Sequence, residues 1–159
     1  MGVEDRAAQH VRAGVGYGWM LPTGDFSSTD ETGWQFLGAV EVTLPRTPLA
    51  IRADGMYGGT QGKDAFEVGT YHVSVWTASL VCHIGSPVAP IRPYVLAGVG
   101  FNAAESAYDA ALTAGTGLSV GPSRWKAFAE ARYISAGNAG STSTPLTFVA
   151  ITGGLSFGF

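Results

Sequence analysis

Apolar and polar residues alternate with a period of two along most of this chain, and the pattern is interrupted by stretches rich in Gly, Pro, Ser, Thr, Asp and Asn. Such alternation is typical of β-strands with two different faces, and a helical spacing of apolar residues is almost absent. The pattern predicts eight strands, over residues 8–21, 33–44, 49–58, 67–84, 91–101, 111–120, 125–134 and 147–159. The sequence therefore predicts one all-β domain over residues 1–159, in which residues 1–7 form a flexible N-terminal segment.

The connections between the predicted strands alternate in length. Four are longer, over residues 22–32, 59–66, 102–110 and 135–146, and three are shorter, over residues 45–48, 85–90 and 121–124. In an up-and-down meander this alternation places the longer loops at one end and the shorter turns, with both termini, at the other. Outer-membrane barrels have short periplasmic turns and longer outer loops, and their strands are about 9–11 residues long. The prediction is an eight-stranded antiparallel up-and-down transmembrane β-barrel with its termini on the periplasmic side.

Each strand has one strongly apolar face and one face of mainly small residues. In the last strand the apolar face consists of Val149, Ile151, Gly153, Leu155, Phe157 and Phe159. The opposite face consists of Phe148, Ala150, Thr152, Gly154, Ser156 and Gly158. A water-exposed face would carry many Lys and Glu, whereas small residues suit the narrow interior of an eight-stranded barrel. The apolar face is therefore predicted to contact lipid, and a soluble ligand-binding barrel is the alternative fold.

Aromatic residues near strand ends support the membrane interpretation, because membrane barrels carry aromatic girdles at both interfaces. The predicted girdle consists of Trp19, Trp34, Tyr57, Trp125 and Tyr133.

One strand departs from simple alternation: Val73 and Val75 share one face, while Leu80 and Cys82 lie on the other. A β-bulge near Trp76 or Thr77 is expected to bring these residues to the same side.

Composition narrows the functional classes. Charged residues make up 13% of the chain, against roughly 25% in soluble domains. A transmembrane helix is excluded because no run of about 18 uncharged apolar residues occurs. With a net charge of −3 and no basic cluster, nucleic-acid binding is not expected. The single cysteine, Cys82, forms no internal disulfide, and no cofactor or metal site is expected. The first ten residues lack the pattern of a signal peptide, which fits either a mature form or a protein that is not secreted.

Charged residues on the small-residue face form the best-defined polar group. They are Arg12, Glu41, Arg52, Asp54, Glu130 and Arg132. Because isolated buried charges are costly, they are expected to pair into a network that plugs the lumen. A gated narrow path for ions or solutes is the alternative. Catalysis is not expected: His72 and Ser74 share one strand face, but the nearby carboxylate, Glu67, lies on the opposite face of the same strand.

Two stretches resemble a known family. The segment RPYVLAGVGFN (residues 92–102) and the C-terminal strand are similar to those of small eight-stranded outer-membrane barrels of Gram-negative bacteria, the OmpA-, OmpX- and OmpW-like porin family. The resemblance implies that the C-terminus carries a signal read by the barrel-assembly machinery. The matching residues are Thr152, Gly154, Phe157 and Phe159.

The resemblance implies a bacterial outer-membrane location, with outer-membrane lipid and the assembly machinery as partners. The expected function is that of a non-enzymatic barrel with a structural or surface-interaction role, a plugged lumen and long polar loops exposed outside. Two alternatives stay open: a narrow pore or carrier for small or hydrophobic solutes, and self-association into ordered arrays.

Overall fold

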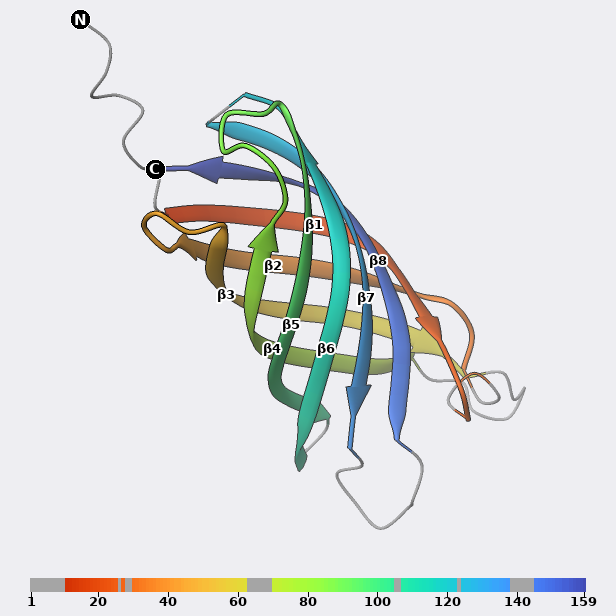
Figure 1. The fold of residues 1–159 in the computed structure, drawn as a ribbon. Helices are drawn as coiled ribbons and strands as arrows, with labels where there is room; N and C mark the ends of the chain where they lie inside the picture. Colours follow the sequence, from red (N-terminus) through yellow and green to blue (C-terminus); the bar gives the residue numbers. More distant parts are fainter. Residues whose placement is uncertain are drawn as a thin grey trace, which may run out of the picture.

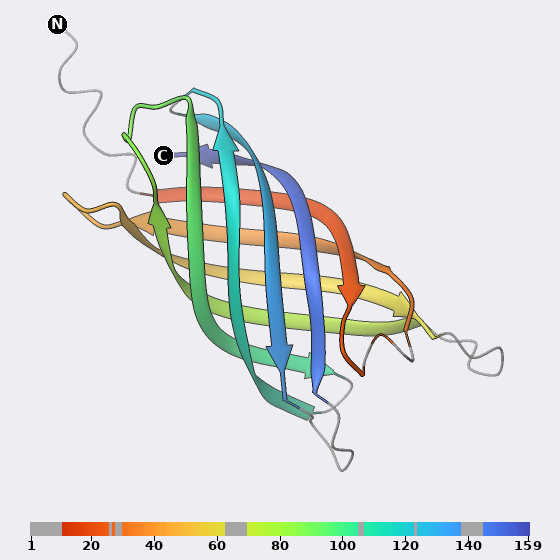
Figure 2. The ribbon, with the colours of Figure 1, turned by 45° about the vertical axis from the view of Figure 1, so that its right-hand side comes forward.

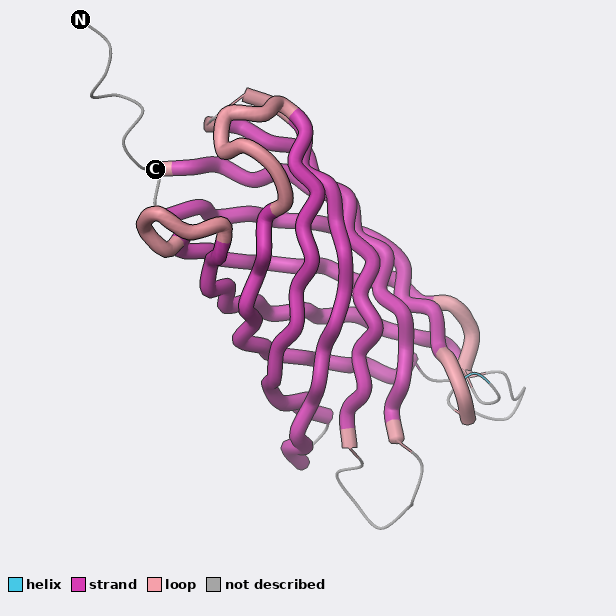
Figure 3. The backbone as a smooth tube through the Cα atoms, viewed as in Figure 1, coloured by secondary structure: helices cyan, strands magenta, loops and turns pink. Residues whose placement is uncertain are grey.

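A computed structural model describes residues 11–25, 27, 30–62, 70–104, 107–122, 124–137 and 145–159, and strands make up most of them (Figure 3). The chain forms one closed barrel of eight strands (Figure 1). The strands are β1 (Val11–Pro22), β2 (Gly33–Thr43), β3 (Leu49–Gln61), β4 (Thr70–His83), β5 (Ile91–Ala104), β6 (Ala107–Val120), β7 (Trp125–Ala136) and β8 (Leu146–Gly158). Each strand pairs antiparallel with its neighbours in sequence, and β8 pairs with β1. The sheet therefore has no free edge.

The two ends of the barrel differ. The start of β1 and the end of β8 lie at one end, together with the connections 44–48, 84–90 and 121–124 (Figures 1 and 2). We name this the terminus end, and there the Phe159 amide donates to the Val11 carbonyl at 2.9 Å. The opposite end, which carries the connections after β1, β3, β5 and β7, is named the loop end. No helix in the described ranges is long and apolar enough to cross a bilayer.

The prediction of eight antiparallel strands is confirmed, but the predicted alternation of loop lengths is wrong for one connection. The expected long loop 102–110 is two strand ends joined by residues 105 and 106 alone. The pairs Asn102↔Asp109 and Ala103↔Tyr108 continue the β5–β6 ladder to this point. This segment contains no Gly or Pro to interrupt pairing, so the hairpin extends farther than its alanine-rich sequence indicated. The predicted flexible segment 1–7 lies outside the described residues.

The predicted bulge in β4 is also wrong. The register of β4 stays constant against both β3 and β5. Val73 and Val75 point into the barrel and are each 1% exposed, whereas Trp76 and Leu80 lie on the outer wall. The apolar residues of β4 change from one face to the other because the inside of the barrel is apolar at the loop end, where Val73 and Val75 lie, whereas the outer wall is apolar throughout.

The outer wall of the barrel is apolar, as the alternation predicted. Along β7, for example, Trp125, Ala131 and Tyr133 are exposed, whereas Lys126 and Arg132 point inward and are buried. The same outer wall exposes large side chains on other strands, among them Val15, Phe36, Ile51, Leu80, Val99, Leu112 and Leu155. A wall of this composition is typical of strands that face hydrocarbon.

Candidate functional site

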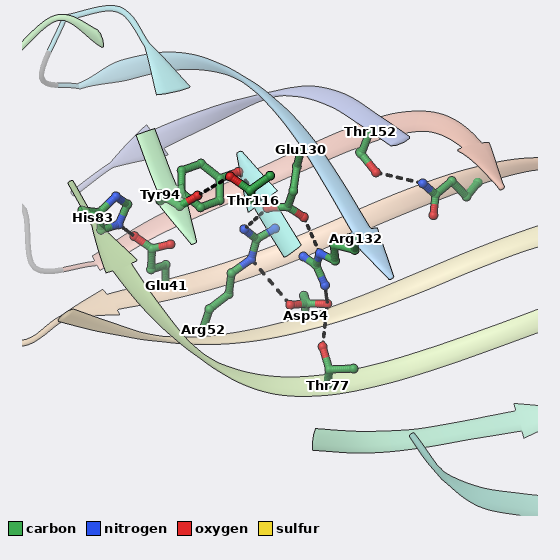
Figure 4. A network of polar contacts seen from close by, with 11 residues as sticks. Glu41, Arg52, Asp54, Thr77, His83, Tyr94, Thr116, Glu130, Arg132 and Thr152 are labelled. Carbon is green, nitrogen blue, oxygen red and sulfur yellow. Dashed lines mark hydrogen bonds and ion pairs between the residues drawn. The ribbon is translucent and has the colours of Figure 1, made fainter. Parts of the chain in front are cut away.

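The barrel lumen is crossed at mid-height by four charged side chains from opposite walls (Figure 4). Arg52 and Asp54 come from β3, and Glu130 and Arg132 from β7. Residues two apart on a strand point to the same face, so each strand presents one cation and one anion to the lumen. We name these four residues the lumen quartet.

The lumen quartet is held by ion pairs that span the barrel. Arg52 Nη1 lies 2.8 Å from Glu130 Oε2, and Arg132 Nη1 lies 2.7 Å from Asp54 Oδ1. Pairs within each strand complete the ring: Arg52 Nε lies 3.5 Å from Asp54 Oδ2, and Arg132 Nε donates to Glu130 Oε1. Two cations and two anions alternate, so the buried group carries no net charge.

Two hydroxyl groups add hydrogen bonds to the carboxylates of the lumen quartet. The Tyr94 hydroxyl donates to Glu130 Oε2 at 2.7 Å, and Thr77 Oγ1 donates to Asp54 Oδ1 at 2.9 Å. The quartet side chains are at most 6% exposed. Buried charges are tolerated when they are paired and their remaining hydrogen-bonding capacity is used. All four charges of the quartet are paired, and the Glu130 carboxylate accepts hydrogen bonds at both of its oxygens.

Arg12 and Glu41, which were predicted to belong to the same network, have other contacts toward the terminus end. Glu41 Oε1 lies 2.8 Å from His83 Nε2, and Arg12 Nη1 donates to Ser156 Oγ at 3.3 Å. Glu41 is the register neighbour of Arg52, yet the Arg52 side chain reaches across the lumen instead. His83, which its place near a strand end had suggested to be an interface or solvated residue, and Tyr94 were not predicted to join the lumen charges. Their inward direction could have been found from strand parity, because they share faces with Val81 and Leu96.

The lumen on the loop-end side of the quartet is filled by an apolar core. Its buried members are Met20, Leu37, Met56, Val73, Val75, Ala111, Ile134, Ala136, Leu146, Phe148 and Ala150. Among them Gln35 Nε2 donates to Thr152 Oγ1 at 2.8 Å. Strand alternation predicted small residues and charges on this inner face. The larger residues were visible on the inner faces, but strand alternation gives no information about which of them meet in the closed barrel.

Glycines on the inner faces make room for an aromatic ring in the lumen. A Cβ atom at Gly154 would lie 2.6 Å from Phe128 Cζ, and one at Gly16 would lie 3.2 Å from the same atom. Cβ atoms in real structures essentially never lie closer than 3.0 Å to another heavy atom, so any side chain at position 154 would clash with the Phe128 ring. Gly154 therefore has a packing role in the barrel besides its place in the predicted assembly signal.

The four residues of the predicted assembly signal divide between the two faces of β8 and its end. Thr152 and Gly154 are on the inner face, and Thr152 is 2% exposed. Phe157 and Phe159 are on the outer wall, with ring centroids 5.1 Å apart in an edge arrangement. Phe159 follows the last residue of β8 and is 66% exposed.

The predicted girdle residues all lie on the outer wall. Trp19, Trp34, Tyr57 and Tyr133 are toward the loop end of their strands, and Trp125 is at the terminus end. The Trp34 ring is 5.9 Å from that of Tyr57, and the Trp125 ring is 4.7 Å from that of Phe157. Aromatic rings thus occur near both ends of the outer wall, as at the two interfaces of membrane barrels.

His72 and Ser74 each form a hydrogen bond with a neighbouring aromatic side chain on the outer wall. His72 Nδ1 lies 3.0 Å from the Tyr57 hydroxyl, and Trp76 Nε1 donates to Ser74 Oγ at 3.1 Å. Glu67, the carboxylate considered with them, is outside the described residues. Within the described part of the chain, no group of three His, Cys, Asp or Glu side chains is placed to hold a metal ion.

Comparison with known proteins supports the fold. No family model matches the chain, and no curated protein is similar to it in sequence. Among solved structures, it is similar to Neisserial surface protein A (NspA), with a TM-score of 0.69 and 16% identity over 94% of this chain and 96% of that one. The fold is that of a small outer-membrane β-barrel.

Two further structures agree. The N-terminal β-barrel domain of Pseudomonas aeruginosa OprF gives a TM-score of 0.60 with 16% identity, over 95% of this chain and 98% of that one. Ail, the attachment invasion locus protein of Yersinia pestis, gives a TM-score of 0.57 with 18% identity, over 94% of this chain and 97% of that one. The likeness extends over almost the whole length of both partners, so the barrel fold accounts for nearly all of this chain.

Proposed function

We propose that this protein is a non-enzymatic β-barrel of the bacterial outer membrane with a structural and surface-interaction role. The observation that carries the proposal is the combination of an apolar outer wall with a lumen that is blocked at mid-height and filled toward the loop end. Such a barrel offers lipid contact outside and no continuous aqueous path inside. The names of two structural neighbours, a surface protein and an attachment invasion locus protein, are in keeping with a surface role.

The proposed orientation places the terminus end in the periplasm and the loop end outside the cell. The supporting feature is the loop end's polar connections 23–32, 62–69 and 137–145, which contain many Gly, Ser, Thr and Asp residues. Outer-membrane barrels place their longer connections outside. These loops would then form the surface that binds other molecules, and the outer wall of the barrel would contact outer-membrane lipid.

The orientation and the surface exposure are tested together with an epitope tag. A tag inserted between residues 140 and 141 is expected to be labelled by antibody on intact cells. The same tag inserted between Ser86 and Pro87, at the terminus end, is expected to be labelled only after the outer membrane is permeabilised. Labelling of the second site on intact cells, with none at the first, would reverse the proposed orientation.

A narrow pore is the second candidate function, and the lumen argues against it. A conducting path would have to pass between side chains of the lumen quartet that are at most 6% exposed, and then through the apolar core. We therefore expect the purified protein to give no conductance steps in a planar lipid bilayer, under conditions in which a general porin gives regular steps. Reproducible steps from this protein would overturn the proposal of a plugged lumen.

Assembly is proposed to depend on the C-terminal aromatic residue. Removing Phe159 is expected to reduce strongly the amount of folded barrel in the outer membrane, while the purified and refolded protein keeps nearly the same unfolding free energy. The reason is that Phe159 is exposed and contributes only one backbone hydrogen bond to the closed sheet. The measurement compares heat-modifiable gel mobility from cells with unfolding in detergent.

Phe159→Tyr is the matched control for this deletion, since it keeps a terminal aromatic ring. It is expected to assemble like the wild type. Equal amounts of assembled barrel with and without Phe159 would contradict a role in recognition by the assembly machinery.

A further inference from the structure

The terminus-end half of the lumen is open. A cavity of about 1050 Å³ lies between the lumen quartet and the connections 44–48, 84–90 and 121–122, with Arg52 and Tyr94 at its inner side. We name this cavity the vestibule. Ligand sites for small molecules measure about 300–1000 Å³ and occur in the mouths of β-barrels. The vestibule is therefore large enough to hold a small molecule, and the quartet blocks its inner end.

Positive charge dominates the wall of the vestibule. Arg12, Arg92 and Lys126 line it from three strands, β1, β5 and β7. The acidic side chain in the wall is Glu41, and its carboxylate is engaged by His83 at 2.8 Å. A concave site with charge of one sign and walls of low polarity concentrates ions of the opposite sign.

Two of these cations, Arg92 and Lys126, have no carboxylate within ion-pair distance in the part of the chain that the structure describes. Lys126 is only 7% exposed and makes neither an ion pair nor a side-chain hydrogen bond there. Arg92 Nε is buried and has no hydrogen-bond partner. A cation inside a barrel without an acidic partner is unfavourable, whereas the lumen quartet pairs each of its two cations with an anion. Among the described residues, the barrel pairs the charges of the quartet at mid-height and leaves Arg92 and Lys126 without an ion pair where the lumen opens.

The rim of the vestibule is apolar. It is formed by Leu44, Pro45, Pro48, Pro87, Val88 and Pro122. Proline side chains have few conformations to lose, so a surface of this kind contacts an apolar group at small entropic cost. The vestibule thus combines cations deep in its wall with a rigid apolar rim.

We propose that the vestibule binds a small anionic molecule, whose carboxylate or phosphate group pairs with Arg92 and Lys126 and whose apolar part contacts the proline-rich rim. Guanidinium groups bind carboxylate and phosphate through paired hydrogen bonds, and a lysine supplies a point charge beside them. The ligand would enter and leave from the terminus end. This site is separate from the plug and from the outer loops, so it goes beyond the proposed surface role.

The test uses the full chain, purified in an uncharged detergent, with phenyl phosphate and benzoate as probes and benzyl alcohol as the uncharged control. Titration calorimetry is expected to show saturable binding of at least one anion and none of the alcohol, and the stronger anion identifies the head group. Lys126→Gln is expected to weaken that binding about tenfold or more, because a hydrogen bond to a charged group is lost. Arg124→Gln is the matched control: it removes the same charge at the same end, but Arg124 does not line the vestibule.

A second measurement separates a binding role from a folding role. Without ligand, Lys126→Gln is expected to keep or raise the unfolding temperature, because it removes a cation that has no ion pair and lies near the other cations of the vestibule. With phenyl phosphate present, the wild type is expected to gain thermal stability and the variant is not. Absence of saturable anion binding, equal binding of benzyl alcohol, or equal weakening by Arg124→Gln would each overturn the proposal.

Discussion

Replacing Glu130 by alanine is expected to lower the free energy of unfolding by about 3–5 kcal/mol. The Glu130 carboxylate accepts hydrogen bonds from Arg52, Tyr94 and Arg132. Its removal leaves two guanidinium groups facing each other in the lumen with Asp54 as their one remaining acidic partner in the quartet. The variant therefore loses hydrogen bonds and gains repulsion between buried cations.

Glu31→Ala is the control for this variant, because Glu31 is exposed and lies at the loop end, away from the quartet. Its expected effect is within about 0.5 kcal/mol of zero. Both variants are unfolded by urea in lipid vesicles and followed by tryptophan fluorescence. Similar midpoints for Glu130→Ala and Glu31→Ala would mean that the quartet does not stabilise the barrel.

Replacing Val99 by arginine is expected to destabilise the membrane-embedded barrel by about 2–4 kcal/mol. Val99 is 62% exposed and stands at the middle of β5, between Ala78 and Leu112 on the neighbouring strands. In water an exposed valine can be exchanged for arginine at little cost. In hydrocarbon the guanidinium must be dehydrated or must draw water and head groups inward.

Val88→Arg is the matched control, since Val88 is also exposed, at 77%, but lies in the connection 84–90 outside the sheet. It is expected to change the unfolding free energy by less than about 0.5 kcal/mol. A small, equal effect of both arginines in phosphatidylcholine vesicles would contradict lipid contact at the wall. It would favour the soluble barrel instead.

The architecture could be predicted from sequence because it depends on local alternation. Trp125, Ala131 and Tyr133 alternate with Lys126 and Arg132 along one strand, and the two faces are visible without knowledge of any partner. The β5–β6 hairpin and the straight β4 were predicted wrongly for a related reason. Where small or apolar residues occupy both faces, alternation no longer distinguishes strand from loop or inside from outside.

The pairing of the lumen charges could not be predicted in the same way. Arg52 and Glu130 are 78 residues apart and belong to strands on opposite walls. Which charges meet across a barrel depends on the stagger of all eight strands, and no single strand carries that information. Strand parity was sufficient to place Arg52, Asp54, Glu130 and Arg132 inside, but it also grouped Arg12 and Glu41 with them. The vestibule was overlooked for the same reason, because it exists only once the barrel has closed.

The central claim is that the apolar outer wall contacts lipid, and the native tryptophans test it directly. All four tryptophans of the chain, Trp19, Trp34, Trp76 and Trp125, are on the outer wall, and Trp76 is at mid-strand. In vesicles of brominated phosphatidylcholine, most of the tryptophan emission is expected to be quenched relative to unbrominated lipid, with little quenching by aqueous acrylamide. Emission that brominated lipid leaves unchanged and acrylamide quenches would contradict the account.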